Sequence, residues 1–251
     1  MIELKIQDLS FRYGKKKPIF DNFNLTVNDG ITLLLGANGA GKSTLFKLLC
    51  DVLIPQKGKI ELSVDGKPVP EAQKKRCLAY IPQNFDVFPT LTVYETLTYI
   101  CRTRNSALSK NDVKSQVEHA LMLADIEKYA RSKMKSLSGG TKQRVGIAQS
   151  ILGSPEIIVA DEPTAGLDPE QRERYHRLVH ETAKDRCFII STHLFEDTEY
   201  YNDLILICDG ALTFKGTKDE FVNSVKSEDG KPVTIKDAWI YYANSQSDKN
   251  D

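Results

Sequence analysis

A glycine-rich segment between an apolar stretch and a helix-like stretch places the strongest limit on how this chain folds. Residues 36–43 fit the pattern G-x-x-x-x-G-K-[ST], after strand-like residues 31–35 and before helix-like residues 44–53. Glycines let the backbone curl so that successive N–H groups point at one anion, and the start of a helix adds its positive end. The pattern predicts a phosphate-binding loop within an α/β fold.

Each part of this segment has an expected task. Lys42 supplies a point charge for the outer phosphates, and the Ser43 hydroxyl is a hard oxygen ligand suited to Mg²⁺. An ordinary glycine-rich loop is the alternative, but the strand–loop–helix context is the one that the motif requires. The residues expected to bind the phosphates are Gly36, Asn38, Gly39, Ala40, Gly41, Lys42, Ser43 and Thr44.

Two adjacent acids follow the apolar run at residues 157–160. Asp161, at the tip of this predicted strand, is placed to hold the Mg²⁺ shell that phosphate transfer requires. Glu162 is placed to polarise a water for attack on the terminal phosphate, a general-base role. Two acids after a strand also form solvated turns; the phosphate loop upstream favours the chemical role.

The order of apolar patterns predicts the architecture. Ile2, Leu4 and Ile6 alternate with polar residues, as N-terminal antiparallel strands do, and 59–64 followed by Asp65 and Gly66 predicts a hairpin. Residues 92–152 carry apolar side chains at helical spacing. The chain is therefore predicted to have a mostly parallel sheet, an N-terminal antiparallel β-subdomain and a helical insertion at about 92–152. The sheet strands are expected at 31–35, 78–81, 157–160 and 188–191, short apolar runs buried on both faces.

Composition narrows the class of protein. Lys plus Arg total 34 and Asp plus Glu total 34, so no global field attracts a polyphosphate backbone and no nucleic-acid partner is expected. No segment approaches the roughly 18 apolar residues that span a bilayer, and the N-terminus lacks a signal-peptide core, which indicates a cytoplasmic protein. Five scattered cysteines are expected to be small buried hydrophobes in a reducing compartment.

Residues 137–140 read Leu-Ser-Gly-Gly, and they make the pattern specific. The phosphate loop, Gln83, this LSGG, the acid pair, Leu167-Asp168 and His193 stand in that order along the chain. Together they resemble the nucleotide-binding domain of ABC ATPases, which implies a P-loop NTPase core with ATP as the nucleotide. The resemblance covers about residues 1–221, leaving 222–251 as a short C-terminal extension whose last nine or so residues are expected to be frayed.

The resemblance also implies roles for single residues. Tyr13 would stack on adenine, although an aromatic residue at a strand end is also commonly part of the core. Gln83 would touch Mg²⁺ or the attacking water and sense the partner, and His193 would contact the terminal phosphate. The loop at 165–168 would communicate across a dimer.

Physical reasoning supports a phosphate role for the LSGG segment. Ser138, Gly139 and Gly140 open a predicted helix, whose start offers a hydroxyl, free N–H groups and a positive dipole end. In the family, the LSGG of one subunit closes on the ATP of the other, so a homodimer or a close heterodimer is implied. Thr141, where Gln is usual, and Ala160, where a larger aliphatic residue is usual, depart from the family pattern without removing a catalytic group.

Two further pairs of residues are ambiguous. His176 and His180 are four apart in a helix-like stretch and could hold a metal, but with no third ligand evident a solvated face is the expected arrangement. Phe85 and Phe88 follow Gln83 in a predicted loop. They either receive a short helix from a membrane partner or pack under the helical insertion.

The resemblance favours a transporter motor, with the membrane-spanning permease as a separate chain and this chain attached peripherally to the inner face of the membrane. A soluble ABC ATPase acting on ribosomes, nucleic acid or metal-cluster assembly is the alternative, and a regulatory module without turnover is a third class. Four segments resemble ABC-2 exporters, so export of a solute is expected. They are 80–85 (YIPQNF), 91–95 (LTVYE), 142–149 (KQRVGIAQ) and 234–239 (TIKDAW).

Overall fold

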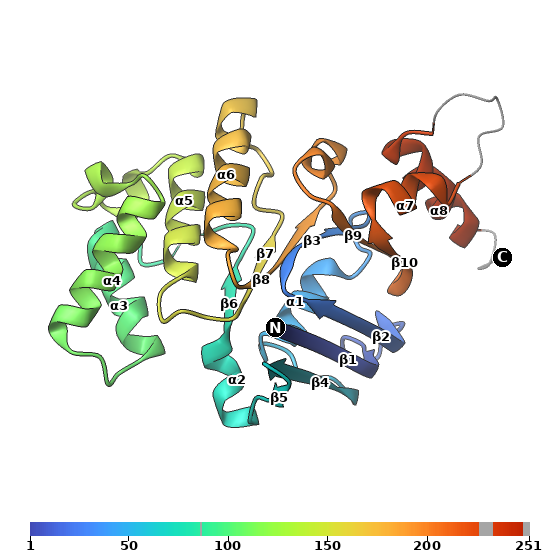
Figure 1. Ribbon diagram of the computed structural model, residues 1–251, viewed down its shortest axis with the longest axis horizontal. Coiled ribbons are helices and arrows are strands. Elements are labelled where there is room, and N and C mark those ends of the chain that lie inside the picture. Colours follow the sequence, from blue (N-terminus) through green and yellow to red (C-terminus); the bar gives the residue numbers. More distant parts are fainter. Residues whose placement is uncertain (86, 226–232, 248–251) are drawn as a thin grey trace. The chain divides into compact units, whose positions relative to one another are not determined.

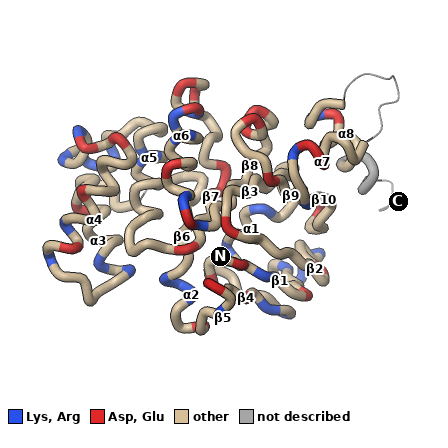
Figure 2. Tube along the Cα trace, viewed as in Figure 1, with Lys and Arg blue, Asp and Glu red and all other residues tan. Residues whose placement is uncertain are grey.

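The computed structural model describes residues 1–85, 87–225 and 233–247, arranged in two compact units (Figure 1). Unit 1 comprises Met1–Val69 and Cys187–Asp251, and unit 2 comprises Pro70–Arg186. Figure 2 shows Lys and Arg interspersed with Asp and Glu along both units. On α6 (Pro169–Thr182), for example, Glu170 pairs with Arg174 and Glu173 with Arg177, each four residues along the helix.

An antiparallel sheet forms the N-terminal part of unit 1. Ile2, Leu4 and Ile6 are at most 4% exposed, whereas the polar residues between them point to solvent, so the alternation buries one face. Asp65 and Gly66 both have positive φ in the turn between β4 and β5, as the sequence predicted. The strands, in spatial order, are β2 (Phe20–Asn28), β1 (Ile2–Phe11), β4 (Lys57–Val64) and β5 (Lys67–Pro68).

A second, mostly parallel sheet completes unit 1. Its strands, in spatial order, are β10 (Ala211–Thr217), β9 (Asp203–Cys208), β3 (Gly30–Leu35) and β8 (Cys187–Thr192). Only the β10–β9 pair among these is antiparallel. The helices of unit 1 are α1 (Lys42–Leu49), η3 (Phe195–Glu199), α7 (Lys218–Asn223) and α8 (Ile235–Ser247).

Unit 2 contains one pair of parallel strands and the predicted helical segment. The strands β6 (Leu78–Ile81) and β7 (Ile157–Asp161) are paired in parallel. Thr92 and Ser109 start α3 and α4 as capping boxes, with Glu95 and Asp112 closing them. The helices are α2 (Glu71–Cys77), α3 (Val93–Arg104), α4 (Lys110–Leu123), η1 (Glu127–Tyr129), η2 (Met134–Ser136), α5 (Gly139–Ser150) and α6 (Pro169–Thr182).

The α/β architecture with an antiparallel N-terminal sheet, a mostly parallel sheet and inserted helices is confirmed. The helix predicted at 44–53 is shorter at its C-terminal end and stops at Leu49. Asp51 adopts a left-handed conformation there, and Pro55 follows, so the chain cannot continue as a helix. Within the described residues, none of the helices combines the length and the apolarity needed to cross a bilayer.

Three smaller predictions have mixed outcomes. His176 is fully buried on α6 beside Tyr175, so the prediction of a solvated histidine face is wrong for His176 and right for the exposed His180. Cys77, Cys101 and Cys187 are buried, whereas Cys50 and Cys208 are half-buried, and none of these five cysteines forms a disulfide. Of the tail expected to be frayed, residues 248–251 lie outside the described residues, and those before them belong to α8.

Candidate functional site

The predicted phosphate loop joins β3 to α1 in unit 1. Gly39 and Gly41 have φ of 87° and 107°, a backbone conformation that side chains other than glycine rarely adopt. A Cβ on Gly36 would lie 2.6 Å from the carbonyl oxygen of Ile207, which is too close for any side chain. Backbone conformation and close packing therefore both require glycine here, and α1 begins directly behind the loop with its positive end toward it.

The loop carries one buried cation and one exposed hydroxyl. Lys42 is 4% exposed, and its Nζ donates hydrogen bonds to the carbonyl oxygens of Gly36 (2.8 Å) and Ala37 (3.2 Å). Ser43, the next residue, is exposed. The ammonium group is thus held against its own loop, and the hydroxyl offers a hard oxygen ligand at the helix start.

Tyr13 lies at the surface of unit 1 rather than in the core. Its side chain is 39% exposed, and its ring packs edge-on against Phe11 with centroids 5.0 Å apart. Its hydroxyl shares a 3.4 Å hydrogen bond with Thr44 Oγ1 in the first turn of α1. The alternative of a core aromatic is therefore excluded, and one edge of the ring is left accessible beside the phosphate loop.

His193 and the phosphate loop extend from the same edge of one sheet. In the parallel pair β3–β8, Leu35 is the register partner of Thr192. Gly36 and His193 each come directly after these partners, so both lie at the carboxyl ends of neighbouring strands. Ligands of open α/β sheets bind at this edge, where His193 lies with its side chain exposed to solvent.

The two adjacent acids of unit 2, Asp161 and Glu162, accept hydrogen bonds from residues in β6 and just after it. Tyr80 donates from its hydroxyl to Asp161 Oδ2 (3.3 Å), and Gln83 donates from Nε2 to Glu162 Oε2 (3.2 Å). Asp161 is 4% exposed at the end of β7. Glu162 has φ of 45°, a left-handed conformation uncommon outside glycine, which turns the chain sharply after the strand. The predicted Gln83 and Glu162 therefore meet within one unit.

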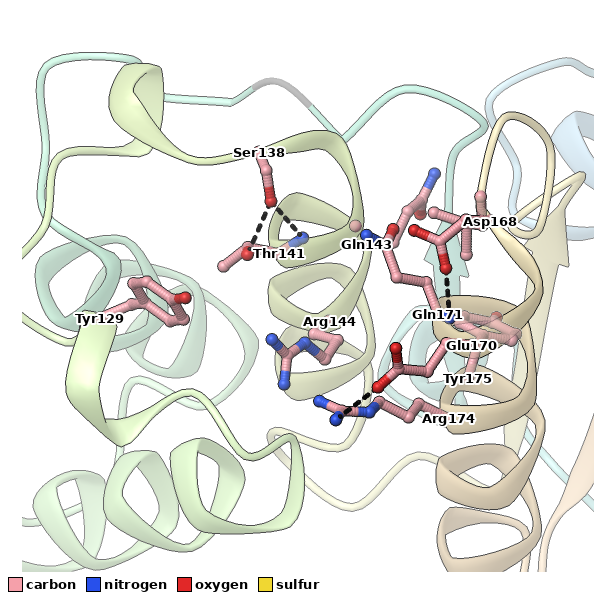
Figure 3. Close-up of a pocket in the computed structure, with 12 residues that line it drawn as sticks. Tyr129, Ser138, Thr141, Gln143, Arg144, Asp168, Glu170, Gln171, Arg174 and Tyr175 are labelled. Atoms are coloured by element: carbon pink, nitrogen blue, oxygen red, sulfur yellow. Dashed lines mark hydrogen bonds and ion pairs between the residues drawn. The ribbon is translucent and has the colours of Figure 1, made fainter.

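The LSGG segment opens α5 as predicted, with Ser138 as the N-cap. The Ser138 Oγ accepts a hydrogen bond from the Thr141 backbone N–H (3.3 Å) and lies 2.9 Å from Thr141 Oγ1. Asp168 caps α6 in the same way, accepting from the Gln171 backbone N–H (2.9 Å). Both helix starts line a hollow of about 240 Å³. Figure 3 shows the residues that line it. Two capped helix N-termini facing one hollow favour an anion or a polar ligand.

Glutamines of α5 that the sequence analysis did not single out as site residues connect this helix to the segment around Gln83. Gln143 donates from Nε2 to the Gln83 carbonyl oxygen (2.9 Å), and Gln149 donates to the Tyr80 carbonyl oxygen (3.0 Å). Both glutamines are at most 8% exposed. A buried amide needs a hydrogen-bond partner. Two glutamines in a helix with the apolar residues Val145, Ile147 and Ala148, which are buried, were therefore the sequence signal that could have identified these contacts.

The predicted loop aromatics have different surroundings. Phe85 is 5% exposed and packs within unit 2, whereas Phe88 is 38% exposed and packs edge-on against Tyr99 of α3 with centroids 5.0 Å apart. Asp86, between them, lies outside the described residues. Of the two alternatives, packing within the helical part of unit 2 therefore describes Phe85 fully, whereas Phe88 packs on one side and is exposed on the other.

The predicted site residues form two groups, one in each unit. Unit 1 holds Tyr13, Gly36, Asn38, Gly39, Ala40, Gly41, Lys42, Ser43, Thr44 and His193. Unit 2 holds Gln83, Ser138, Gly139, Gly140, Asp161 and Glu162.

Comparison with known proteins gives the family. The family model described as ABC transporter matches residues 20–165. The chain belongs to the ABC transporter family. It is 33% identical over 220 residues to the phosphonates import ATP-binding protein PhnC 1 of a Ruegeria species, covering 81% of this chain and 84% of that protein. It is also 33% identical over 200 residues to the Nod factor export ATP-binding protein I of Burkholderia thailandensis, covering 78% of this chain and 64% of that protein.

A solved structure agrees with this assignment. The chain is similar to cbiO1 of Clostridium perfringens, described as part of the ABC transporter complex cbiONQ. The similarity has a TM-score of 0.77 and 28% identity, and it covers 88% of this chain and 91% of that one. This ABC transporter chain is therefore an ATP-binding ATPase subunit with a P-loop NTPase core.

The residues present fit ATP and a divalent cation. The close approach of Ile207 to Gly36 and the positive φ of Gly39 and Gly41 leave the loop as bare backbone, which is what a polyphosphate cradle needs. The Ser43 hydroxyl and the Asp161 carboxylate, each within its own unit, are hard oxygen donors of the kind that Mg²⁺ prefers.

Proposed function

We propose that this chain is the motor subunit of a transporter whose membrane-spanning permease is a separate polypeptide, with Mg²⁺ as the cofactor of ATP. The observation that carries the proposal is the complete set of nucleotide-handling residues in a chain whose relatives are described as parts of transport systems. The ATPase domain corresponds to about residues 1–221, with 222–251 as a C-terminal extension. The chain would associate with the inner face of the membrane through that permease.

The site supports a division of tasks on the nucleotide. Tyr13 stacks on adenine and Lys42 neutralises the outer phosphates, while Ser43 and Asp161 hold Mg²⁺. Bound Mg²⁺ supplies charge neutralisation on the phosphate oxygens. The loop residues Gly36, Asn38, Gly39, Ala40, Gly41 and Thr44 surround the phosphates.

Glu162 acts as the general base on the attacking water, since its carboxylate is an acceptor already oriented by the hydrogen bond from Gln83. Gln83 itself contacts the water or Mg²⁺. His193, at the edge shared with the phosphate loop, contacts the terminal phosphate.

Ser138, Gly139 and Gly140 bind the terminal phosphate of a nucleotide held by a second subunit. The capped start of α5 presents a hydroxyl and a helix dipole of the right sign for this contact. Two chains, identical or closely related, then enclose two nucleotides. ATP binding closes this dimer and hydrolysis opens it.

Export is the proposed direction, because four segments of the sequence resemble ABC-2 exporters. Overall identity does not decide direction, since an import protein and an export protein are each 33% identical to this chain. The half-exposed Phe88 beside Tyr99 is a candidate contact for the permease.

The test is affinity purification of the tagged full-length chain from gently solubilised cells. Co-purification of a multi-spanning membrane protein in equal amount supports the motor role, and the sequence of that protein narrows cargo and direction. Recovery with ribosomes, nucleic acid or soluble assembly proteins alone would transfer the chain to the soluble ABC ATPases.

A further inference from the structure

The C-terminal helix α8 begins at a defined residue and is fixed to unit 1 by its aromatic side chains. Thr234 and Asp237 form a reciprocal cap, with Thr234 N donating to Asp237 Oδ2 (2.9 Å) and Asp237 N donating to Thr234 Oγ1 (3.2 Å). Tyr242 stacks on Phe221 of α7 with centroids 5.6 Å apart, and its hydroxyl donates to Ser224 Oγ (2.9 Å). Figure 1 shows α7 and α8 next to each other. The helix is therefore a packed part of unit 1.

One aromatic residue of α8 reaches the segment that follows His193. Trp239 packs edge-on against Phe195, with ring centroids 5.4 Å apart and the planes at 71°. Phe195 is the first residue of η3 and lies two positions after His193. Both rings are only half-buried, so each covers the other, and such a pair contributes about 0.5–1.5 kcal/mol beyond its buried area.

The strand side of the same segment is fixed by a buried polar pair. Thr192 Oγ1 donates to Asp197 Oδ2 (2.6 Å), and the Leu194 backbone N–H donates to Thr192 Oγ1 (3.0 Å). His193 thus lies between two attachments, one to its own strand and one to a helix that starts 42 residues later in the chain, at Ile235. Only the second attachment depends on the C-terminal extension.

We propose that Trp239 is a positioning residue for His193: through Phe195, α8 holds the segment that places the imidazole on the terminal phosphate. This rests on the role proposed above for His193. The C-terminal extension then governs the rate of hydrolysis without contacting the nucleotide, and a change in α8 alters turnover rather than ATP affinity.

The variant test uses the full chain with Trp239→Ala, Trp239→Phe and the control Ile240→Ala, a neighbouring α8 side chain that is 40% exposed. We expect Trp239→Ala to lower kcat about tenfold with an unchanged Kd for ATP, as small misplacements of catalytic groups do. Trp239→Phe should restore most of the rate, because an aromatic ring still covers Phe195. Equal kcat for Trp239→Ala and Ile240→Ala would overturn the proposal.

Fluorescence provides a second measurement that needs no destabilising variant. Trp239 is the single tryptophan of the chain, so the tryptophan emission comes from the residue that packs against Phe195. Saturating Mg-ATP should change the emission of the wild-type protein, and His193→Ala should abolish that change while ATP still binds. Unchanged wild-type emission at saturation would overturn the proposal even if Trp239→Ala did not fold.

The failure of this proposal can be distinguished from failure of the motor mechanism. If Glu162→Gln hydrolyses ATP as fast as the wild type, the general-base role proposed above is wrong. If Glu162→Gln is inactive but Trp239→Ala is fully active, only the positioning role of Trp239 is lost.

Discussion

The ammonium group of Lys42 is buried at the phosphate loop, which makes Lys42 the residue whose loss should affect nucleotide binding most directly. Two of its hydrogen-bond acceptors are carbonyl oxygens of its own loop, which carry no formal charge. A phosphate oxygen carries negative charge, so it attracts the same ammonium more strongly than a carbonyl oxygen does.

Lys42→Ala should therefore weaken ATP binding by about 10- to 100-fold, since hydrogen bonds to charged groups contribute about 1.5–3 kcal/mol. Lys47→Ala is the matched control, because Lys47 lies in the last turn of α1, away from the loop. The measurement is the equilibrium Kd for a fluorescent ATP analogue. The same Kd for Lys42→Ala and the wild type would contradict the cradle assignment.

The buried thiol of Cys187 should make the free energy of unfolding depend on pH in the alkaline range. Burial in β8, with a smaller effect from nearby Asp29, raises the pKa of this thiol to about 12 from an ordinary value of 9.0. In the unfolded chain the thiol ionises above about pH 9, whereas in the folded chain it stays protonated. Its contribution to stability is therefore complete below pH 9 and is lost as the pH rises from 9 toward 12.

Cys187→Ala removes this dependence. The difference in unfolding free energy between the wild type and Cys187→Ala should be constant from pH 7 to about 9 and should then shrink as the pH rises. Urea unfolding at a series of pH values measures it. A difference that stays constant up to pH 11 would mean that the folded thiol ionises normally.

At the scale of elements, α5 performs two tasks with different faces. Its first turn presents Ser138 and Thr141 to the hollow shared with α6. Its buried amides, Gln143 and Gln149, hold the β6 segment that carries Gln83. The segment around Gln83 is thus joined by hydrogen bonds, within one unit, to the helix whose start carries LSGG.

The start of α4 tests how far local sequence determines an element. Ser109→Ala removes the hydroxyl that caps the Asp112 backbone N–H, which should cost about 1 kcal/mol of stability. Ser106→Ala, at an exposed serine three residues earlier, is the control and should be within about 0.5 kcal/mol of the wild type. Urea unfolding compares the two. Equal losses in both variants would show that the cap is not the cause.

The elements also show what the sequence could and could not predict. The N-terminal strands and the phosphate loop were predictable because the alternation of Ile2, Leu4 and Ile6 and the glycine-rich segment are local patterns. The burial of His176 was not predictable, because it depends on which side of α6 faces the core. His180, four residues later, points about 40° farther around the helix axis. Contacts such as Gln143 to Gln83 and Trp239 to Phe195 join distant segments, which periodicity does not reveal.

At the scale of the whole molecule, the division of the site residues between two units bears on how ATP acts. Unit 1 carries the phosphate loop and His193, and unit 2 carries the acid pair and the LSGG segment. A chain with one copy of each set can use its LSGG on a second chain. The oligomeric state should then depend on nucleotide, and it should be most persistent where hydrolysis is blocked.

Glu162→Gln isolates that effect. The amide oxygen can still accept the hydrogen bond from Gln83 Nε2, but a neutral amide cannot take a proton from water. With Mg-ATP this variant should have negligible turnover and a mass by light scattering near twice the 28.2 kDa of one chain. Glu181→Gln, at an exposed acid on α6, is the control and should behave like the wild type.

Two outcomes would contradict different parts of the mechanism. If Glu162→Gln binds ATP and remains a monomer, ATP-driven dimerisation is removed from the mechanism. If it hydrolyses ATP at the wild-type rate, the general-base role of Glu162 is removed. Because the two readings are independent, each part of the proposed cycle can fail without the other.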